Sequence, residues 1–430
     1  HYPLRRQRQM CIRDRCSMAQ KDLKIYIIGA GVSGLIAAKV LENSGYAPVV
    51  LEATDRAGGR VKTDLIDGFQ LDHGFQVLLS SYPAAQKYLD FKALELQELR
   101  SGAVIFKNGK QQVIGDPLRD ISVLFSTLFS GVGNLLDKIK ILQLSLRLQK
   151  KSIDAIFSSQ EISTKEYLQE FGFSSQMIAQ FFSPFFTGIF LENKLTTSSR
   201  MFEFVFKMFG EGLAVIPKGG MEEISKQLVA KLSNTTFQFN TKVRTVSDEE
   251  IILNTGEKLA STATIIATDA SKLVNNAPPK NLSWKSCQTL YFTANKRVIE
   301  KPMIGLVSEE DSLINNIFYH TSVQTITPFT QELLSVTVVK QHQLSEKELV
   351  TKILMQLKEE CQIDDLTFLA IYHIKNALPD LKDVKYEVLP SETQLSSGIF
   401  LAGDLQLNGS LNAAMISGEK AALRVIDCLA

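Results

Sequence analysis

The sequence predicts an α/β protein in which a Rossmann-like nucleotide-binding domain, built from separated stretches of the chain, carries an inserted α+β domain. Residues 25–28, "IYII", form an apolar run typical of a buried parallel strand, and a glycine-rich stretch at residues 29–34 leads from it into a helical pattern. A second apolar run at residues 47–51 ends at Glu52. Towards the other end of the sequence, residues 399–402 form a further short strand that is again followed by a helical pattern.

The glycine-rich stretch has the spacing G-x-G-x-x-G. Gly29 permits a tight turn, Gly31 lets the backbone approach a pyrophosphate, and Gly34 lets the helix pack closely on the strand. Glu52 stands about 20 residues further on, where an acidic side chain accepts a hydrogen bond from a ribose hydroxyl. The candidate cofactor-binding residues here are Gly29, Ala30, Gly31, Val32, Ser33, Gly34, Glu52 and Ala53. An ordinary glycine-rich turn is the alternative, and this motif alone does not separate NAD from FAD.

The bulk composition describes a globular protein that is large enough for two domains. The chain has 430 residues, is 45% hydrophobic and 22% charged, and carries a formal net charge of +1, which argues against a nucleic acid as its partner. Its five cysteines include no C-x-x-C pair and its five histidines no H-E-x-x-H pair. We therefore expect a cytoplasmic protein with neither a disulfide framework nor a metal site.

Residues 1–17 differ from the rest of the chain. They hold five arginines against one aspartate and lack the apolar region of a secretory signal. We expect this tail to be disordered or foreign to the native protein, with Met18 as the native start.

The stretch after Glu52 indicates which nucleotide is bound. In "EATDRAGGR", Gly58 and Gly59 permit a backbone path close to a ligand, and Arg60 can neutralise a phosphate. The pattern E-x5-G-G-R after G-x-G-x-x-G resembles the FAD-binding start of the superfamily of flavin amine oxidases, protoporphyrinogen oxidases and phytoene desaturases. The resemblance implies FAD in a glutathione-reductase-like domain, with Gly59 and Arg60 along its phosphates or towards the flavin.

A second motif follows the strand at residues 399–402. Gly403 and Asp404 precede a helical pattern from Ser410, whose N-terminus could direct N–H groups at an electron-rich flavin edge. The segment resembles the closing A-G-D motif of the same superfamily. By that resemblance Asp404 contacts the ribityl or pyrophosphate portion, and Leu411 with Asn412 contacts the pyrimidine ring. A helix packed on a sheet through small residues, with Asp404 as a turn residue, is the alternative.

Three interior segments extend the resemblance. Residues 68–79 alternate as strands do around a turn at Asp72-His73-Gly74 and resemble the segment beside the isoalloxazine. Residues 215–228 resemble the loop that leads back into the FAD domain, and residues 239–246 are predicted to be a strand in which Val243 contacts adenine through its backbone. The predicted division assigns 22–80, 213–271 and 391–430 to the FAD-binding domain, and 81–212 and 272–390 to the substrate-binding domain.

The first insertion is helical and aromatic. Eleven of the 25 phenylalanines lie between residues 171 and 209. One interpretation makes them core filler. The other makes part of them the wall of an apolar tunnel to the flavin, as in the desaturase branch that the segment resembles. The tunnel candidates are Phe181, Phe185, Phe186 and Phe190. The second insertion contains strand-like runs at 288–293, 315–320 and 333–339, which suggest a sheet that roofs the flavin.

One stretch concerns membranes. Residues 121–136 are apolar but number only 16, fewer than the ~20 that a spanning helix needs. A buried or amphipathic helix is one interpretation, and a helix docked at a membrane interface is the other.

The resemblance implies hydride transfer to flavin N5 from a largely apolar molecule, such as an isoprenoid, a carotenoid or a porphyrinogen. Dioxygen, a quinone or another acceptor would reoxidise the flavin. No residue is identified as catalytic. His73 is a weak candidate, as a tunable histidine in the predicted flavin-side turn, and a loop histidine hydrogen-bonded to backbone is the favoured interpretation. No cysteine is placed for covalent attachment, so we expect non-covalent FAD. An amine oxidase is one alternative, although no tryptophan- and tyrosine-rich stretch precedes Gly403; an FAD-holding lipid-binding module without turnover is the other. The oligomeric state is left open.

Overall fold

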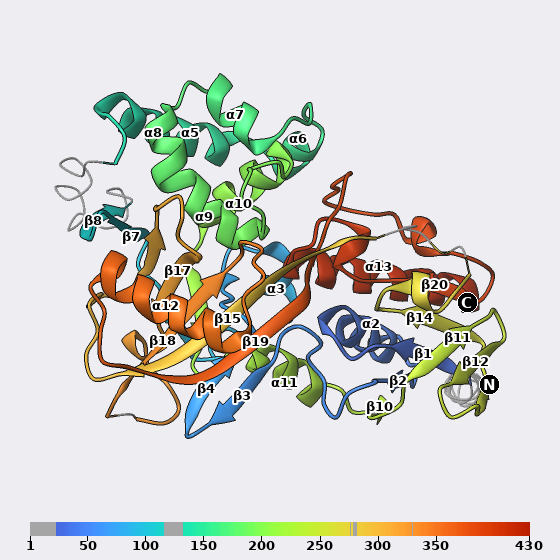
Figure 1. Ribbon diagram of the computed structural model, residues 1–430. Helices are drawn as coiled ribbons and strands as arrows, with labels where there is room; N and C mark the ends of the chain where they lie inside the picture. Colours follow the sequence, from blue (N-terminus) through green and yellow to red (C-terminus); the bar gives the residue numbers. More distant parts are fainter. Residues whose placement is uncertain (1–22, 116–131, 276, 278–281, 329) are drawn as a thin grey trace, which may run out of the picture.

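The computed structural model describes residues 23–115, 132–275, 277, 282–328 and 330–430 (Figure 1). The predictions for the tail at residues 1–17 and for most of the segment at 121–136 therefore lie outside the described residues. Among the residues that are described, no helix is long and apolar enough to cross a membrane.

A five-stranded parallel sheet forms one half of the molecule, as the fold-class prediction requires. Every neighbouring pair of its strands is parallel, and Ile27 of the central strand pairs with Val50 on one side and Ile265 on the other. The strand order is β10 (Thr236–Gln238), β2 (Val49–Leu51), β1 (Ile25–Ile28), β14 (Ala263–Ile266) and β20 (Ile399–Leu401). The predicted strand at 25–28 is thereby confirmed, and the one at 47–51 begins two residues later than predicted.

Alternate residues of this sheet face two different layers. Ile27, Val50, Ile265 and Phe400 belong to the core shared with helices α2 (Val32–Asn43) and α13 (Leu411–Leu429). Their neighbours Ile28, Leu51, Ile266 and Leu401 pack instead with an antiparallel sheet of β11 (Val243–Val246), β12 (Glu250–Leu253) and β13 (Lys258–Ala260). This period of two places the sheet between a helical layer and a β layer.

Small residues let the two helices meet. A Cβ added to Gly418 of α13 would lie 2.2 Å from the carbonyl oxygen of Ser33 of α2. The hydroxyls of Ser33 and Ser417 lie 3.3 Å apart, and Ser417 Oγ also accepts a hydrogen bond from Gly403 N at 3.0 Å. The small residues after Asp404 thus pack against the helix of the first glycine loop.

A seven-stranded mixed sheet forms the core of a second region (Figure 1). Its only parallel pair among the described strands is β7 with β16. Helix α12 (Glu346–Cys361) packs on one face. The order is β19 (Leu366–Pro379), β15 (Trp284–Ala294), β18 (Glu332–Val338), β17 (Ile314–Tyr319), β16 (Ile304–Val307), β7 (Gly102–Lys107) and β8 (Lys110–Gly115). The strand-like runs predicted in the second insertion lie in β15, β17 and β18, except for the last residue of two of them.

Helices α5 to α10 form a third region at the top of Figure 1. They are α5 (Leu135–Lys150), α6 (Ile153–Phe157), α7 (Thr164–Glu170), α8 (Ser175–Met177), the π-helical turn η2 (Ile178–Phe182), α9 (Ser183–Phe190) and α10 (Ser199–Glu211). The remaining elements are β3 (Thr63–Ile66), β4 (Phe69–Asp72), β5 (Leu78–Leu79), α3 (Pro83–Tyr88), β6 (Leu96–Glu98), β9 (Ala214–Pro217), α11 (Glu222–Ala230), and the 3₁₀ turns at Ala270–Lys272, His320–Ser322, Pro390–Thr393 and Asp404–Gln406.

The prediction of one strand over residues 239–246 is wrong in its first half. Asn240 has a φ of +54°, and its N–H donates to Thr54 O at 2.8 Å. Thr241 N donates to Glu52 O at 2.8 Å. These bonds hold the chain beside the end of β2, so the strand begins only at Val243.

Candidate functional site

The first glycine loop joins β1 to α2, as predicted. Gly29 has a φ of +102°, in the left-handed region that favours glycine. A Cβ added to Gly34 would lie 2.0 Å from the carbonyl oxygen of Gly29, which leaves no room for a side chain. Val32 and Ser33, in the first turn of α2, are both buried. The backbone between these residues therefore takes a path that requires glycine at positions 29 and 34.

The second glycine pair lies against the first loop. Gly58 N donates to Ala30 O at 2.9 Å. Gly59 has a φ of +61°, and a Cβ added to it would lie 3.1 Å from the Cα of Gly31. Two stretches of backbone without side chains thus meet, which is the kind of surface that a pyrophosphate can approach.

Glu52 is anchored beside this loop at the end of β2. Its carboxylate accepts hydrogen bonds from Ala30 N at 2.8 Å, from Thr54 N at 2.9 Å and from Thr54 Oγ1 at 2.8 Å. Ala53 is exposed next to it, and Val243 is buried two residues beyond the Thr241 N–H that donates to Glu52 O. The structure therefore brings the predicted ribose and adenine residues together.

Arg60 and Asp404 form an ion pair that joins the two flavin motifs. The Arg60 guanidinium contacts the buried Asp404 carboxylate, donates to Ala377 O at 2.9 Å and lies 5.5 Å from the ring centroid of Trp284. Gly403, next to Asp404, has a φ of +119°. A cation and a carboxylate therefore stand beside the glycine loops, from segments far apart in the sequence.

Helix α13 begins a few residues after this pair. Ser410 caps it by accepting a hydrogen bond from Ala413 N at 3.0 Å. Asn412 is buried and accepts from Ala84 N at 3.0 Å, while Leu411 is partly buried. The predicted helix start is thereby confirmed, and its first turn is held in place by α3.

All these segments leave the parallel sheet at the same edge. The glycine loop follows β1, Glu52 follows β2, and Gly403 follows β20, and each of these strands runs parallel to its neighbours. Nucleotides bind at the carboxyl edge of such sheets. The model of the flavin-containing amine oxidoreductase family matches residues 32–426. The chain belongs to this family. The predicted resemblance is thus confirmed, and FAD is the cofactor of this family.

Sequence relatives of this family member match over part of its length. The L-amino-acid oxidase BmooLAAO-I from Bothrops moojeni is 31% identical over 166 residues, which cover 36% of this chain and 33% of that protein. Protoporphyrinogen oxidase 2 from Arabidopsis thaliana is 28% identical over 169 residues, 38% of this chain and 32% of that protein. The matched part thus spans about a third of the length of these relatives.

Solved structures match over nearly the whole chain. A candidate protoporphyrinogen oxidase from Exiguobacterium sp. 255-15 has a TM-score of 0.71 at 17% identity, covering 94% of this chain and 99% of its own. Cyclohexylamine oxidase from Brevibacterium oxydans has a TM-score of 0.68 at 15% identity, covering 95% and 99%. The predicted fold, a Rossmann-like FAD-binding domain with a second α+β domain, is confirmed.

The residues of this edge fit an FAD molecule. Gly29 and Gly58 combine a positive φ with a contact that excludes a side chain, Gly34 shows such a contact alone, and Gly59 has a positive φ. The backbone of the two loops is therefore bare where a diphosphate needs to approach. Arg60 can neutralise phosphate charge, and Glu52 can accept from a ribose. Cys428 lies exposed near the end of α13, and non-covalent binding stays a prediction.

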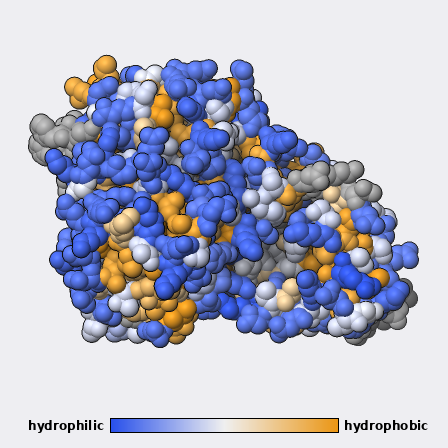
Figure 2. Space-filling view, in the orientation of Figure 1, coloured by the Kyte–Doolittle hydropathy of each residue, from blue (hydrophilic) through white to orange (hydrophobic). Residues whose placement is uncertain are grey.

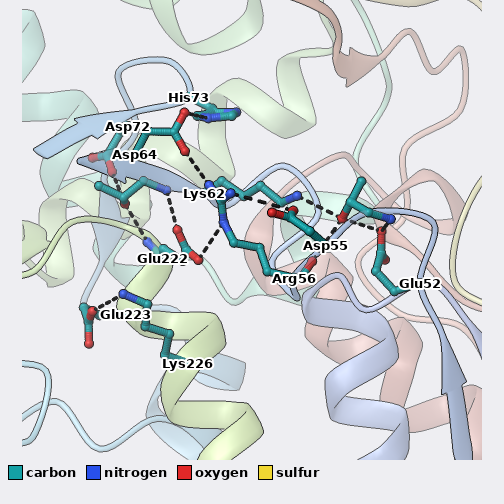
Figure 3. Close-up of polar contacts among 12 residues, drawn as sticks. Glu52, Asp55, Arg56, Lys62, Asp64, Asp72, His73, Glu222, Glu223 and Lys226 are labelled. Carbon is teal, nitrogen blue, oxygen red and sulfur yellow. Dashed lines mark hydrogen bonds and ion pairs between the residues drawn. The ribbon is translucent and has the colours of Figure 1, made fainter. Parts of the chain in front are cut away.

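A polar network around Arg56, Asp64 and Glu222 was not predicted (Figure 3). Asp64 Oδ2 accepts from Tyr372 OH at 2.9 Å and lies 2.8 Å from His73 Nε2, while its Oδ1 pairs with Arg56 at 2.5 Å. Arg56 also pairs with the buried carboxylate of Glu222 at 3.0 Å. One carboxylate thus joins the loop before Gly58, the β3–β4 hairpin and β19 of the large sheet.

Asp72 is the last residue of β4, at the open end of the same hairpin, and is buried. Its Oδ1 accepts from Thr63 Oγ1 at 2.5 Å and from Met221 N at 2.9 Å. Burial raises the pKa of Asp72 to about 6; the two hydrogen bonds oppose this and the charge of Glu222 adds to it. The sequence offered no local signal for these contacts, because Asp72 is one of many acids and its partners come from distant segments.

His73 lies in the predicted turn after β4. Its backbone N–H donates to Lys62 O at 3.0 Å, and its ring centroid lies 4.5 Å from that of Tyr372. The contact between Asp64 and His73 Nε2 fixes the orientation of the imidazole ring. A structural histidine and a catalytic histidine can both show such a fixed ring. A catalytic role for it stays a prediction.

The four tunnel candidates lie in one aromatic cluster of the helical region. Phe186 and Phe190 are buried in the core, whereas Phe181 and Phe185 are partly exposed. Phe185 stacks near Phe181 at 5.6 Å between centroids. The π-helical turn Ile178–Phe182 contains Phe181 and precedes the other three, and such turns are frequent at functional sites.

Proposed function

We propose that the protein is an FAD-dependent oxidoreductase that oxidises a C–H or C–N bond of a largely apolar small molecule. The observation that carries the proposal is the meeting of the glycine loops, Glu52 and the Arg60–Asp404 pair at one edge of the parallel sheet. Family membership supports the same chemistry. When bound, FAD supplies a hydride acceptor at its N5 atom.

The chain's own residues would bind and orient that cofactor. Glu52, held by Ala30 N, presents its carboxylate to the ribose, and Arg60 offers the guanidinium to the diphosphate. The α13 N-terminus would direct N–H groups at the pyrimidine ring from Leu411 and Asn412. Reoxidation would need dioxygen, a quinone or another acceptor.

An isoprenoid, a carotenoid or a porphyrinogen is the substrate class that we favour. Phe181 and Phe185 supply partly exposed aromatic surface in a region otherwise packed with phenylalanine. An apolar substrate would gain binding free energy by burying its surface there. An amine oxidase is the second candidate, because relatives such as BmooLAAO-I are named as L-amino-acid oxidases.

The first experiment measures the visible spectrum of the purified full chain, before and after denaturation. Flavin bands that pass into the supernatant are expected and would establish non-covalent FAD. Arg60→Ala should lower flavin retention at least about tenfold, because it removes the cation at the proposed diphosphate. Asp404→Asn should lower it as well, because it removes the carboxylate that pairs with Arg60 and holds the guanidinium in place. Lys347→Ala, which removes an exposed cation on α12, should leave retention unchanged. A folded chain that cannot be reconstituted with FAD would refute the proposal.

A second experiment separates the substrate classes. The flavin is reduced anaerobically with carotenoids, porphyrinogens and amines in turn, and its bleaching is followed. Bleaching by an apolar donor alone supports the favoured class, and bleaching by amines with release of hydrogen peroxide supports an amine oxidase. A flavin that no donor reduces would indicate a binding module without turnover.

A further inference from the structure

Helix α5 is fixed to the protein along one face and at both ends. Asp137 closes a capping box with Asn134 and accepts from Ser174 Oγ at 2.6 Å. Buried Lys207 donates to Leu148 O at 2.9 Å and to Gln149 O at 3.1 Å at the other end. With Asp137, Leu144 and Leu148 buried, these contacts fix which side of α5 faces outward.

The outward side of α5 is apolar. Leu135, Ile139, Leu142 and Leu146 recur at helical spacing, opposite the buried face, and are between 41% and 63% exposed. With Leu136 they make up five of the eleven large hydrophobic residues exposed in the described chain. Figure 2 shows hydrophobic side chains at the outer end of the helical region, where α5 begins in Figure 1. We name these five residues the α5 stripe.

Basic residues border the α5 stripe. By the helical spacing of 100° per residue, Lys138 and Lys150 lie on its two sides, and Arg147 lies further round the helix, over the Phe171 ring. Lys140 lies nearer the buried face and donates to Gly172 O. The one acidic residue of α5, Asp137, is buried on the opposite face. The outward half of the helix therefore combines apolar side chains with positive charge and has no negative charge of its own.

We propose that the α5 stripe docks onto an anionic lipid surface. Leucine and isoleucine side chains would enter the boundary between headgroups and acyl chains, while the flanking lysines and arginine contact lipid phosphates. Charge complementarity selects a lipid surface over a second copy of the chain, because two copies would bring these basic borders together. The helix would lie along the surface, since about 24 Å of helix with a one-sided stripe cannot span it.

Flotation of the full chain with lipid vesicles tests this proposal. The chain is mixed with vesicles of phosphatidylcholine alone or with about a quarter phosphatidylglycerol, at low and high salt. Binding to the anionic vesicles that weakens with salt is expected. Ile139→Glu/Leu142→Glu should weaken it at least about tenfold, because charged side chains oppose insertion. Leu65→Glu/Leu389→Glu, at residues 70% and 64% exposed on other elements, should bind as the native chain does.

A charge-reversal variant gives a second test, which changes the basic residues and leaves the apolar side chains of the α5 stripe in place. Arg147→Glu/Lys150→Glu should weaken binding to anionic vesicles and leave binding to phosphatidylcholine unchanged. The thermal unfolding midpoint of each variant is measured beside it, and at most a small decrease is expected, from the lost contact of Arg147 with the Phe171 ring. Absence of vesicle binding by the native chain would overturn the proposal. So would self-association in solution that Ile139→Glu/Leu142→Glu abolishes, because a second copy would then be the occupant.

Discussion

We expect the contribution of Asp72 to the stability of this protein to fall as the pH rises through the acid range. Burial raises its pKa from 3.8 in a model peptide to about 6. The native state therefore binds a proton at Asp72 more readily than the unfolded chain does, and this group's contribution to stability falls as pH rises from about 4 to about 6. A difference of about two pKa units corresponds to about 3 kcal/mol of unfolding free energy over that whole interval.

Asp72→Asn removes this titration. The amide oxygen can still accept from Thr63 Oγ1 and Met221 N, so the variant keeps both hydrogen bonds that Asp72 Oδ1 accepts. Between about pH 7.5 and about pH 4.5, the native protein should gain about 2 kcal/mol relative to the variant. Other titrating groups cancel because both proteins carry them, including His320, whose pKa burial lowers to about 4.

Urea unfolding of both proteins at the two pH values measures this quantity. The unfolding free energy of the variant minus that of the native protein should be larger at about pH 7.5 than at about pH 4.5, whatever the sign of the difference. Equal differences at both pH values would refute the assignment of a raised pKa. A difference that grows towards low pH in the variant's favour would show that Asp72 is instead stabilised as the carboxylate.

Three further outcomes follow from contacts at the glycine loop and the polar network. Gly34→Ala should cost more than about 3 kcal/mol of unfolding free energy and abolish flavin retention, because its Cβ would lie 2.0 Å from a backbone oxygen. Gly210→Ala is the neutral control, because its Cβ would meet its nearest atom at 4.0 Å. Gly418→Ala should lower the thermal unfolding midpoint by several degrees, since α13 would be pushed from α2; an unchanged midpoint would contradict that packing. Tyr372→Phe should cost about 1 kcal/mol through the lost bond to Asp64, and no loss in urea unfolding would show that water replaces it.

The sequence was informative wherever a structure depends on neighbouring residues. The strand at 25–28, the turn at Gly29 and the start of α13 at Leu411 follow from apolar runs, glycine spacing and a capping serine. Their physical causes act within a few residues, so a pattern in the sequence contains them.

Contacts between distant segments could not be predicted in this way. Tyr372 donates to Asp64 across 308 residues, and nothing in either local sequence marks the partner. The false strand start at 239 has a similar origin, because bonds from Asn240 and Thr241 to the β2 end override a plausible alternation. Arg60 and Asp404 were each predicted to meet FAD, but their direct pairing was not.

The order of strands in the parallel sheet also determines how the protein can reach its native state. The central strand β1 pairs with β14, and β14 pairs with β20. Each of these two pairings closes a long loop of chain, and the two loops together contain the strands of the large mixed sheet. Such non-local pairing slows folding, because a large loop-closure entropy is lost before any contact compensates it. During synthesis, β1 and β2 emerge long before either later strand and must wait with an unpaired edge. Acquisition of flavin would therefore report that the entire chain has folded, whereas the large sheet can be complete earlier.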